Sequence, residues 1–210
     1  MNPADPKRDL IILVADRNME AFVTGILKRP KSLNIQPVTF DIRRHPEQDN
    51  GCRTGGVEFL SPFKNQYKHA ILMFDREGSG AEIKSTEVIE LELERDLEDD
   101  WGARGAVIVI DPELENWVWS NSPQVEQVLG WSGRVPPLQD WLKQKDFLHP
   151  KAVKPPRPKE ALEKALWLVR KPRSSAIYQL LAERVSLSQC TDRAFGKFKG
   201  IMERWFREEN

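Results

Sequence analysis

Short apolar runs that end in aspartate constrain the fold of this chain more than any other feature of its sequence. Leu10–Ala15, Ala70–Phe74 and Gly105–Ile110 are continuous apolar runs, which predicts strands that are buried on both faces. Val38–Ile42 predicts a further short strand. Segments with helical spacing lie between these strands. This alternation predicts an α/β fold with a mostly parallel four-stranded sheet flanked by helices.

The helices of the first half follow from apolar spacing and from proline and glycine. Apolar residues from Met19 to Leu27 recur at helical spacing, and Pro30 follows them. Arg43–Gly56 is expected to be a loop because it holds a His-Pro pair and several glycines, with a helix from about Val57 to Tyr67. Thr86–Asp99 is expected to be a highly charged helix.

The second half of the chain is expected to be helical. The sequence therefore predicts an α/β domain at residues 1–120 and a helical C-terminal region at 121–210. His149–Lys159 holds four prolines, which predicts an extended, exposed linker. The expected helices are Glu113–Ser120, Gln124–Trp131, Leu138–Lys145, Lys159–Arg170, Ser174–Val185 and Asp192–Phe206.

Charge divides the chain into an acidic part and a basic part. The 32 basic and 32 acidic residues balance, but residues 151–210 carry 14 lysines and arginines against 7 acids. The basic part could contact nucleic acid or an acidic partner, or could pack on the acidic part of its own chain. The apolar runs are too short to cross a bilayer, and Cys52 and Cys190 form no CxxC motif, so we expect a cytoplasmic protein without a membrane partner.

Acidic residues follow the predicted strands directly. Asp16, Asp75 and Asp111 each end an apolar run, and Glu77 forms a D-x-E pair with Asp75. Ligands of parallel sheets bind at the carboxyl ends of the strands, where these acids should meet. Carboxylates that converge there could hold a hard divalent ion such as Mg²⁺. Alternatively, the acids cap helices and solvate loops.

Two segments carry a resemblance to Toprim domains of the overcoming-lysogenisation-nuclease-like group. Leu13–Glu20 (LVADRNME) resembles the first motif of that group, in which a strand ends in V-E-G-x-x-E and leads into a helix. Ile71–Glu77 (ILMFDRE) resembles the second motif, a strand that ends in D-x-D. The general likeness covers roughly residues 8–120.

A narrower likeness extends over the whole chain. Val107–Trp119 (VIVIDPELENWVW) is similar to a P-x-I-E-x-W element of small bacterial Toprim-like proteins, and Arg173–Ala176 and Phe195–Trp205 also resemble that group. More narrowly, the chain resembles a small component of methylation-associated anti-phage defence systems. This resemblance implies other defence-system proteins as partners and, as substrate, the phosphate backbone of DNA or RNA.

The resemblance also implies roles for individual residues. Asp16, Asp75 and Glu77 would hold Mg²⁺ or Mn²⁺, and Glu20 and Glu115 would assist catalysis. Toprim nucleases commonly place a basic residue at the scissile phosphate. Lys171 or Arg173 would take that part if the C-terminal helices fold over the site.

This chain departs from the family motifs at three positions. Asp16 replaces a glutamate, Arg17 replaces a glycine and Glu77 replaces an aspartate. Each acid keeps its charge, but phosphodiester cleavage with metal ions tolerates small displacements poorly. Arg17 and Arg76 could bind phosphate, or could simply pair with the neighbouring acids.

Several interpretations therefore stay open. The chain could be a Mg²⁺-dependent nuclease, a non-catalytic subunit that binds a larger defence protein, or a module that senses a metal or nucleotide and regulates a separate nuclease. Glu113 and Glu115 could complete an acidic cluster or favour a helix N-terminus. Basic residues around Pro172 could contact phosphate or solvate a helix junction, and Trp117 and Trp119 are expected to be core anchors rather than platforms for bases.

Overall fold

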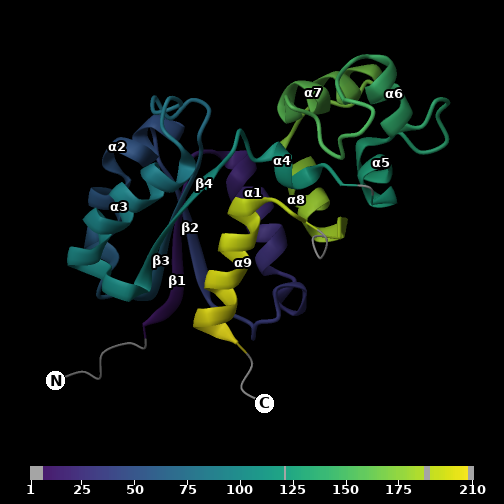
Figure 1. The fold of residues 1–210 in the computed structure, drawn as a ribbon. Coiled ribbons are helices and arrows are strands. Elements are labelled where there is room, and N and C mark those ends of the chain that lie inside the picture. Colours follow the sequence, from purple (N-terminus) through teal and green to yellow (C-terminus); the bar gives the residue numbers. More distant parts are fainter. Residues whose placement is uncertain (1–6, 121, 187–189, 208–210) are drawn as a thin grey trace.

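The structure is a computed structural model of the 210-residue chain and describes residues 7–120, 122–186 and 190–207. Strands and helices alternate through residue 118, and helices and loops make up the described chain beyond it (Figure 1). The elements are β1 (Arg8–Val14), α1 (Arg17–Leu27), η1 (Pro30–Leu33), β2 (Phe40–Arg44), α2 (Gln48–Leu60), η2 (Ser61–Phe63), β3 (Tyr67–Asp75), α3 (Thr86–Trp101), η3 (Gly102–Arg104), β4 (Gly105–Ile110), α4 (Glu115–Val118), α5 (Pro123–Leu129), α6 (Leu138–Gln144), α7 (Pro158–Leu168), α8 (Ser175–Arg184) and α9 (Arg193–Phe206).

The four strands form one parallel sheet in the order β2-β1-β3-β4. This confirms the predicted α/β fold with a four-stranded parallel sheet flanked by helices. The central strands are buried on both faces because side chains alternate along a strand: Leu10 and Ile12 contact one core cluster, whereas Ile11 and Leu13 contact the other. Within the described residues, no helix is long and apolar enough to cross a membrane.

Helices cover both faces of this sheet. Helices α2 and α3 pack on one face, and α1 and α9 pack on the other (Figure 1). Helix α9 places Phe198, Ile201 and Met202 against the sheet, all of them buried. Its N-cap, Asp192, accepts hydrogen bonds from Phe195 N at 3.0 Å and from Trp117 Nε1 at 2.8 Å. The last helix therefore completes the cover of a sheet formed near the beginning of the chain.

The apolar core is continuous across residue 120. One cluster of buried side chains combines β1, β3 and β4 with α1, the short helices α4–α6 and helices α7–α9. Trp117 and Trp119 are buried within this cluster, and Trp119 Nε1 donates to Pro158 O at 2.8 Å. The expectation that these tryptophans anchor the core is confirmed.

The segment Arg43–Gly56 differs from its prediction. It was expected to be a loop, yet helix α2 begins at Gln48 and runs through its glycines. These glycines allow close packing rather than breaking the helix. A Cβ atom at Gly56 would lie 2.7 Å from Leu72 Cδ1, and one at Gly51 would lie 2.0 Å from His45 Nδ1. Leu72, the partner of Gly56, lies on β3 and is distant in sequence, so the local pattern of glycines and proline did not reveal this helix.

The proline-rich segment at residues 149–159 also differs in part from its prediction. No strand is formed there, but Pro155 and Pro158 are buried instead of exposed, and α7 already begins at Pro158. Lys154 Nζ donates to Asn116 O at 2.7 Å. Apolar proline rings and one lysine thus hold much of this segment against the rest of the molecule.

The packing of α9 predicts that the chain loses stability when this helix is damaged. Phe198→Ala removes a fully buried ring and should lower the free energy of unfolding by about 3–5 kcal/mol. Lys199→Ala, the matched change at the neighbouring and more exposed position, should change it by less than about 0.5 kcal/mol. Urea titration followed by tryptophan fluorescence and by circular dichroism measures both. Equal effects of the two variants would contradict the role of α9 as a cover of the sheet.

A candidate metal site at the carboxyl edge of the sheet

Carboxylates gather at the edge of the sheet where its parallel strands end. Asp16 follows β1, Asp75 ends β3, and Glu113 and Glu115 follow β4. Asp49 reaches the same edge from the first turn of α2, and its Oδ1 accepts a hydrogen bond of 2.8 Å from Asp75 N. Parallel pairing places these acids together because every strand ends at the same edge.

Asp75 lies at the centre of this group. Its Oδ1 is inaccessible to solvent and has no hydrogen-bond partner among the described residues. Burial raises the pKa of Asp75 well above its usual value, and repulsion from Asp49, Glu115, Asp16 and Glu113 raises it further. An unpaired buried carboxylate oxygen is unfavourable, so Asp75 should hold a proton or bind a cation.

Glu113 has the same character. Its side chain is buried, and its Oε2 also lacks a partner among the residues that the structure describes. Burial, the charge of Glu115 and the neighbouring Glu77 raise the pKa of Glu113 to about 7, although Lys159 opposes the rise. The pKa of Asp49 is raised as well, first by burial and then by the charge of Asp16. The edge therefore concentrates negative charge in a poorly solvated place.

Glu115 is held by groups of the C-terminal region. Tyr178 Oη donates to Glu115 Oε1, and Arg173 Nη2 donates to the same oxygen at 3.1 Å. Arg173 Nε in turn donates to Tyr178 Oη at 2.7 Å. Burial and the charge of Glu115 raise the pKa of Tyr178 above its usual value, so the phenol stays a donor. The C-terminal helices therefore reach the acidic edge through Arg173.

The other basic residue expected at the site lies elsewhere. Lys171 Nζ donates to Val128 O at 2.6 Å and thereby contacts α5. Lys159, in the first turn of α7, lies close enough to the acids to oppose the rise of the pKa of both Asp49 and Glu113. The structure thus brings Lys159 and Arg173 to the acids and leaves Lys171 away from them.

Two acids named from the sequence make structural contacts. Asp16 Oδ1 accepts a hydrogen bond of 2.8 Å from Met19 N and caps helix α1. Glu20 pairs with Arg44 of β2 at 3.1 Å. Asp16 nevertheless lies near the other acids, and its charge therefore helps to raise the pKa of both Asp49 and Asp75.

The two arginines beside the acids differ from each other. Arg76 pairs with Asp111 at 2.9 Å, an acid that follows β4, and not with the neighbouring motif acids considered from the sequence. Arg17 is exposed and makes no hydrogen bond or ion pair with any described residue. Together with Asp16, Arg44 and His45 it lines a cleft of about 500 Å³ beside the acidic edge. The guanidinium group of Arg17 can therefore bind an anion in this cleft.

The glycine-containing loop after Asp75 is closed by its own chain. Gly78 and Gly80 have positive φ angles of 86° and 75°, a conformation that favours glycine. Their N–H groups both donate to Glu82 Oε1 at 3.0 Å. A carboxylate of the loop therefore occupies the place that a phosphate could take.

Sequence reasoning missed three members of this site. Asp49 lies in the segment that was expected to be a loop, although an acid in a first helical turn is a recognisable helix-start signal. Lys159 and Tyr178 come from distant helices, and no local pattern marks either of them. Among the described residues, no three histidine, cysteine, aspartate or glutamate side chains are already placed to hold one metal ion.

Comparison of the chain with protein-family models, with curated proteins and with solved structures gave no significant match. Fold and site define the class by themselves: an α/β protein with a four-stranded parallel sheet and an acidic carboxyl edge.

The raised pKa of Glu113 makes stability depend on pH. Its folded pKa of about 7 exceeds its usual value of 4.5, so the unfolded chain loses this proton first as the pH rises. The free energy of unfolding should therefore fall between these two pH values. Glu113→Gln should remove that loss and stabilise the protein at pH 8 by about 1–3 kcal/mol, with little gain at pH 4.5.

Urea titrations at both pH values measure this effect, with Glu58→Gln, at an exposed position of α2, as control. A stabilisation by Glu113→Gln that is the same at both pH values would contradict the raised pKa.

Proposed function

We propose that the acidic edge binds Mg²⁺ or Mn²⁺ and that the chain acts on phosphodiesters of nucleic acid as a Toprim-like component of an anti-phage defence system. The observation that carries this proposal is the pair of buried, unpartnered carboxylate oxygens, Asp75 Oδ1 and Glu113 Oε2. Both belong to groups whose pKa is raised by burial and by other acids. A divalent cation would relieve this repulsion better than protons do, because it satisfies several oxygens at once.

The residues present fit such an ion. Hard divalent ions take carboxylate oxygens, and Asp75 and Glu113 offer oxygens that no other described group engages. Asp16, Asp49 and Glu77 lie in the same charge cluster and would complete the ligand set. Because no three of these groups are yet at ligand distance, ion binding requires side-chain movement. A bound ion would neutralise phosphate oxygens and lower the pKa of an attacking water.

Basic groups near the acids support a phosphate as substrate. Lys159 lies near Glu113 and Asp49 without a hydrogen bond or ion pair to any described residue, so its ammonium group can contact a phosphate. Arg173 holds Glu115 in position, and Arg17 lines the adjacent cleft. Lys159 and Arg17 would bind and orient a phosphodiester. Arg173 already donates to Tyr178, Glu163 and Glu115 and would hold the site in shape, and Lys171 lies away from it.

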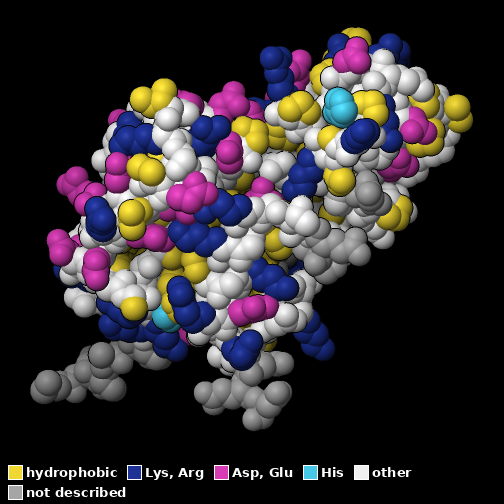
Figure 2. Space-filling model, viewed as in Figure 1, with side chains coloured by type: hydrophobic (Ala, Val, Ile, Leu, Met, Phe, Trp, Pro, Cys, Tyr) yellow, Lys and Arg dark blue, Asp and Glu magenta, His cyan; other side chains and the backbone are white. Residues whose placement is uncertain are grey.

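The surface supports action within a complex. Lysine and arginine are interspersed with aspartate and glutamate over the face shown in Figure 2, and the whole chain has no net charge. Proteins that bind nucleic acid tightly on their own usually present a continuous basic surface. We therefore infer that partner proteins of the defence system supply most of the affinity for nucleic acid.

A second candidate function is a non-catalytic scaffold or regulatory subunit that binds a larger defence protein. Two contacts favour it: Asp16 is engaged as a helix cap, and Glu82 occupies the N–H groups of Gly78 and Gly80. In that case the acids would be a remnant of a metal site. Metal binding separates the two candidates.

Calorimetric titration with Mn²⁺ and Mg²⁺ tests the site directly. Wild type should bind in the micromolar-to-millimolar range and release protons at pH 7, because Glu113 is partly protonated there. Asp75→Asn should abolish binding while the protein stays folded. Asp111→Asn, an acid at the same edge that pairs with Arg76, is the matched control and should bind like wild type. A folded wild type that binds neither ion would favour the scaffold.

Substitution of Lys159 tests the substrate class. Lys159→Gln should lower the rate of Mn²⁺-dependent cleavage of single- or double-stranded nucleic acid by about 100-fold or more, because it removes a charge placed at the phosphate. Metal affinity should stay the same or rise, since a neighbouring cation is lost. Lys164→Gln, on the exposed side of the same helix, should cleave like wild type. Equal rates for both variants would exclude Lys159 from the site.

A further inference from the structure

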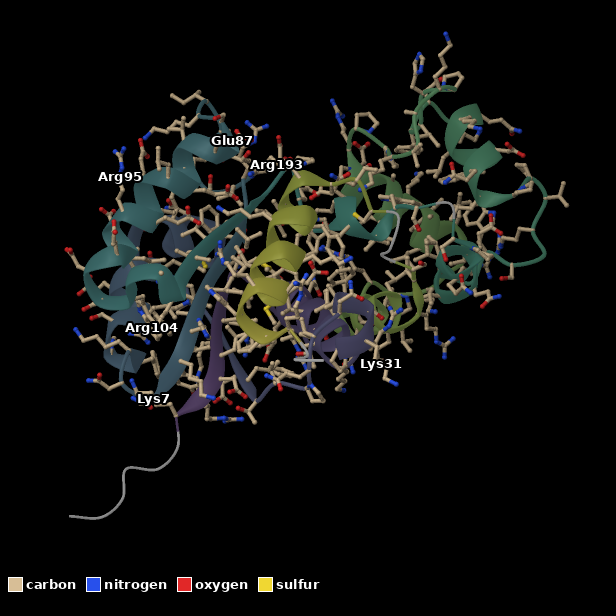
Figure 3. The ribbon with its side chains drawn as sticks, turned by 60° about the horizontal axis from the view of Figure 1, so that its bottom comes forward. Lys7, Lys31, Glu87, Arg95, Arg104 and Arg193 are labelled. Carbon is tan, nitrogen blue, oxygen red and sulfur yellow. The ribbon has the colours of Figure 1, made fainter. Side chains whose placement is uncertain are left out.

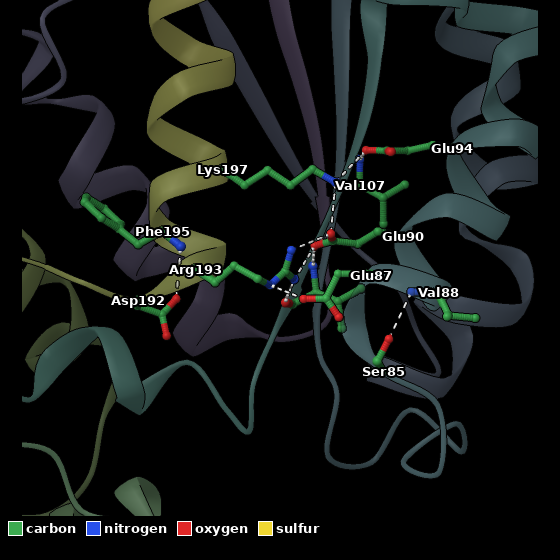
Figure 4. Close-up of polar contacts among 11 residues, drawn as sticks. Ser85, Glu87, Val88, Glu90, Glu94, Val107, Asp192, Arg193, Phe195 and Lys197 are labelled. Atoms are coloured by element: carbon green, nitrogen blue, oxygen red, sulfur yellow. Dashed lines mark hydrogen bonds and ion pairs between the residues drawn. The ribbon is translucent and has the colours of Figure 1, made fainter.

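The two edge strands of the sheet, β4 and β2, differ in whether their outward backbone groups have hydrogen-bond partners. At the β4 edge, side chains of α3 bind the backbone: Glu94 Oε1 accepts from Val107 N at 3.1 Å and Glu90 Oε1 accepts from Val109 N at 2.9 Å (Figure 4). Arg193 and Lys197 of α9 then pair with Glu90 at 2.9 Å and 3.0 Å. The outward donors of β4 are therefore occupied, and this edge is closed to another strand.

The β2 edge has no such cover. Leu10 N donates to Thr39 O and His45 N donates to Val14 O, so the odd-numbered residues of β2 bond to β1. The backbone groups of Phe40, Ile42 and Arg44 consequently point away from the sheet. Among the described residues, these groups have a single partner, a bond of 3.3 Å from Arg8 Nη2 to Phe40 O.

The sequence of β2 is complementary to itself. Antiparallel pairing about a two-fold axis at Ile42 places Asp41 opposite Arg43 of the second copy, twice in the same interface. The same register places Phe40 opposite Arg44, and it aligns the outward donors and acceptors of Phe40, Ile42 and Arg44. Arg43 is exposed and has no ion pair with a described residue, so its charge is available.

Half-buried apolar side chains border this edge on both faces. Phe40 and Ile42 lie on the face of α1. On the face of α2, the ring of Phe59 lies 5.7 Å from that of His45, which directly follows β2. A second copy would cover these groups, which gives the pairing apolar area in addition to hydrogen bonds.

We propose that β2 pairs antiparallel with β2 of a second copy of this chain, so that two sheets join into one. The proposal is independent of metal binding and of catalysis. It requires only the open edge, its self-complementary charges and the apolar groups beside it.

Charge exchange tests the register. Wild type should sediment as a dimer at micromolar concentrations. Arg43→Asp opposes Asp41 to an aspartate twice, and should raise the dissociation constant roughly tenfold or more. Asp41→Arg should do the same by opposing arginines. An equal mixture of the two variants should form dimers as well as wild type does, because every cross-strand pair is again of opposite charge.

Arg95→Asp is the matched control, because Arg95 projects from the outer side of α3, away from β2 (Figure 3). It should leave the dimer unchanged. Asp41→Arg also loses the bonds of Asp41 to Arg8 and Tyr67, so circular dichroism checks its folding, and Arg43→Asp alone keeps the test decisive. In hydrogen exchange, the amides of Ile42 and Arg44 should be protected in the dimer and unprotected after dilution.

A wild type that remains monomeric at every concentration would overturn the proposal. A dimer that neither charge variant weakens, or in which the amides of Ile42 and Arg44 exchange freely, would overturn it equally, because another surface would then form the dimer.

Discussion

The hydrogen bonds of one carboxylate, that of Asp192, tie the end of the chain to the end of the sheet. Asp192 accepts from Trp117 Nε1 and from Asn116 Nδ2, and it caps α9 through Phe195 N. A parallel sheet needs both faces covered, and α9 supplies part of the cover on one of them. The position of α9 also fixes Arg193 and Lys197 beside the β4 edge. The cover of the sheet, the closed β4 edge and the position of α9 thus depend on a contact between segments that are about 75 residues apart in the sequence.

The acidic edge follows from the same topology but opposes stability. Parallel strands end together and α2 begins beside them, so Asp75, Glu113 and Asp49 share a poorly hydrated space where ionisation is unfavourable. The structural groups nearby compensate only in part. Arg173 neutralises Glu115 and Tyr178 donates a hydrogen bond to it, whereas Asp75 and Glu113 keep unpaired oxygens. Stability lost at a cluster of this kind is typical of places that proteins retain for binding.

The sequence predicted what depends on local pattern and missed what depends on distant contacts. Continuous apolar runs revealed the strands, because a strand that is buried on both faces needs an apolar residue at every position, as in Leu10–Ala15. Helix α2 was missed because Gly51 and Gly56 serve close packing against His45 and Leu72, which only the fold reveals. Likewise, Lys171 and Lys159 are both lysines near prolines, and only tertiary structure shows which of them lies beside the acids.

The closed β4 edge has a consequence for the size of any assembly built from this sheet. Glu90 and Glu94 occupy its backbone donors, so strands can be added on the β2 side alone. A protein with a single self-complementary edge strand forms a closed dimer and cannot extend into a filament. Glu90 and Glu94 of α3, together with Arg193 and Lys197 of α9, would therefore prevent a further strand from pairing with β4. This limits an assembly through the sheet to two copies and protects the β4 edge from aggregation.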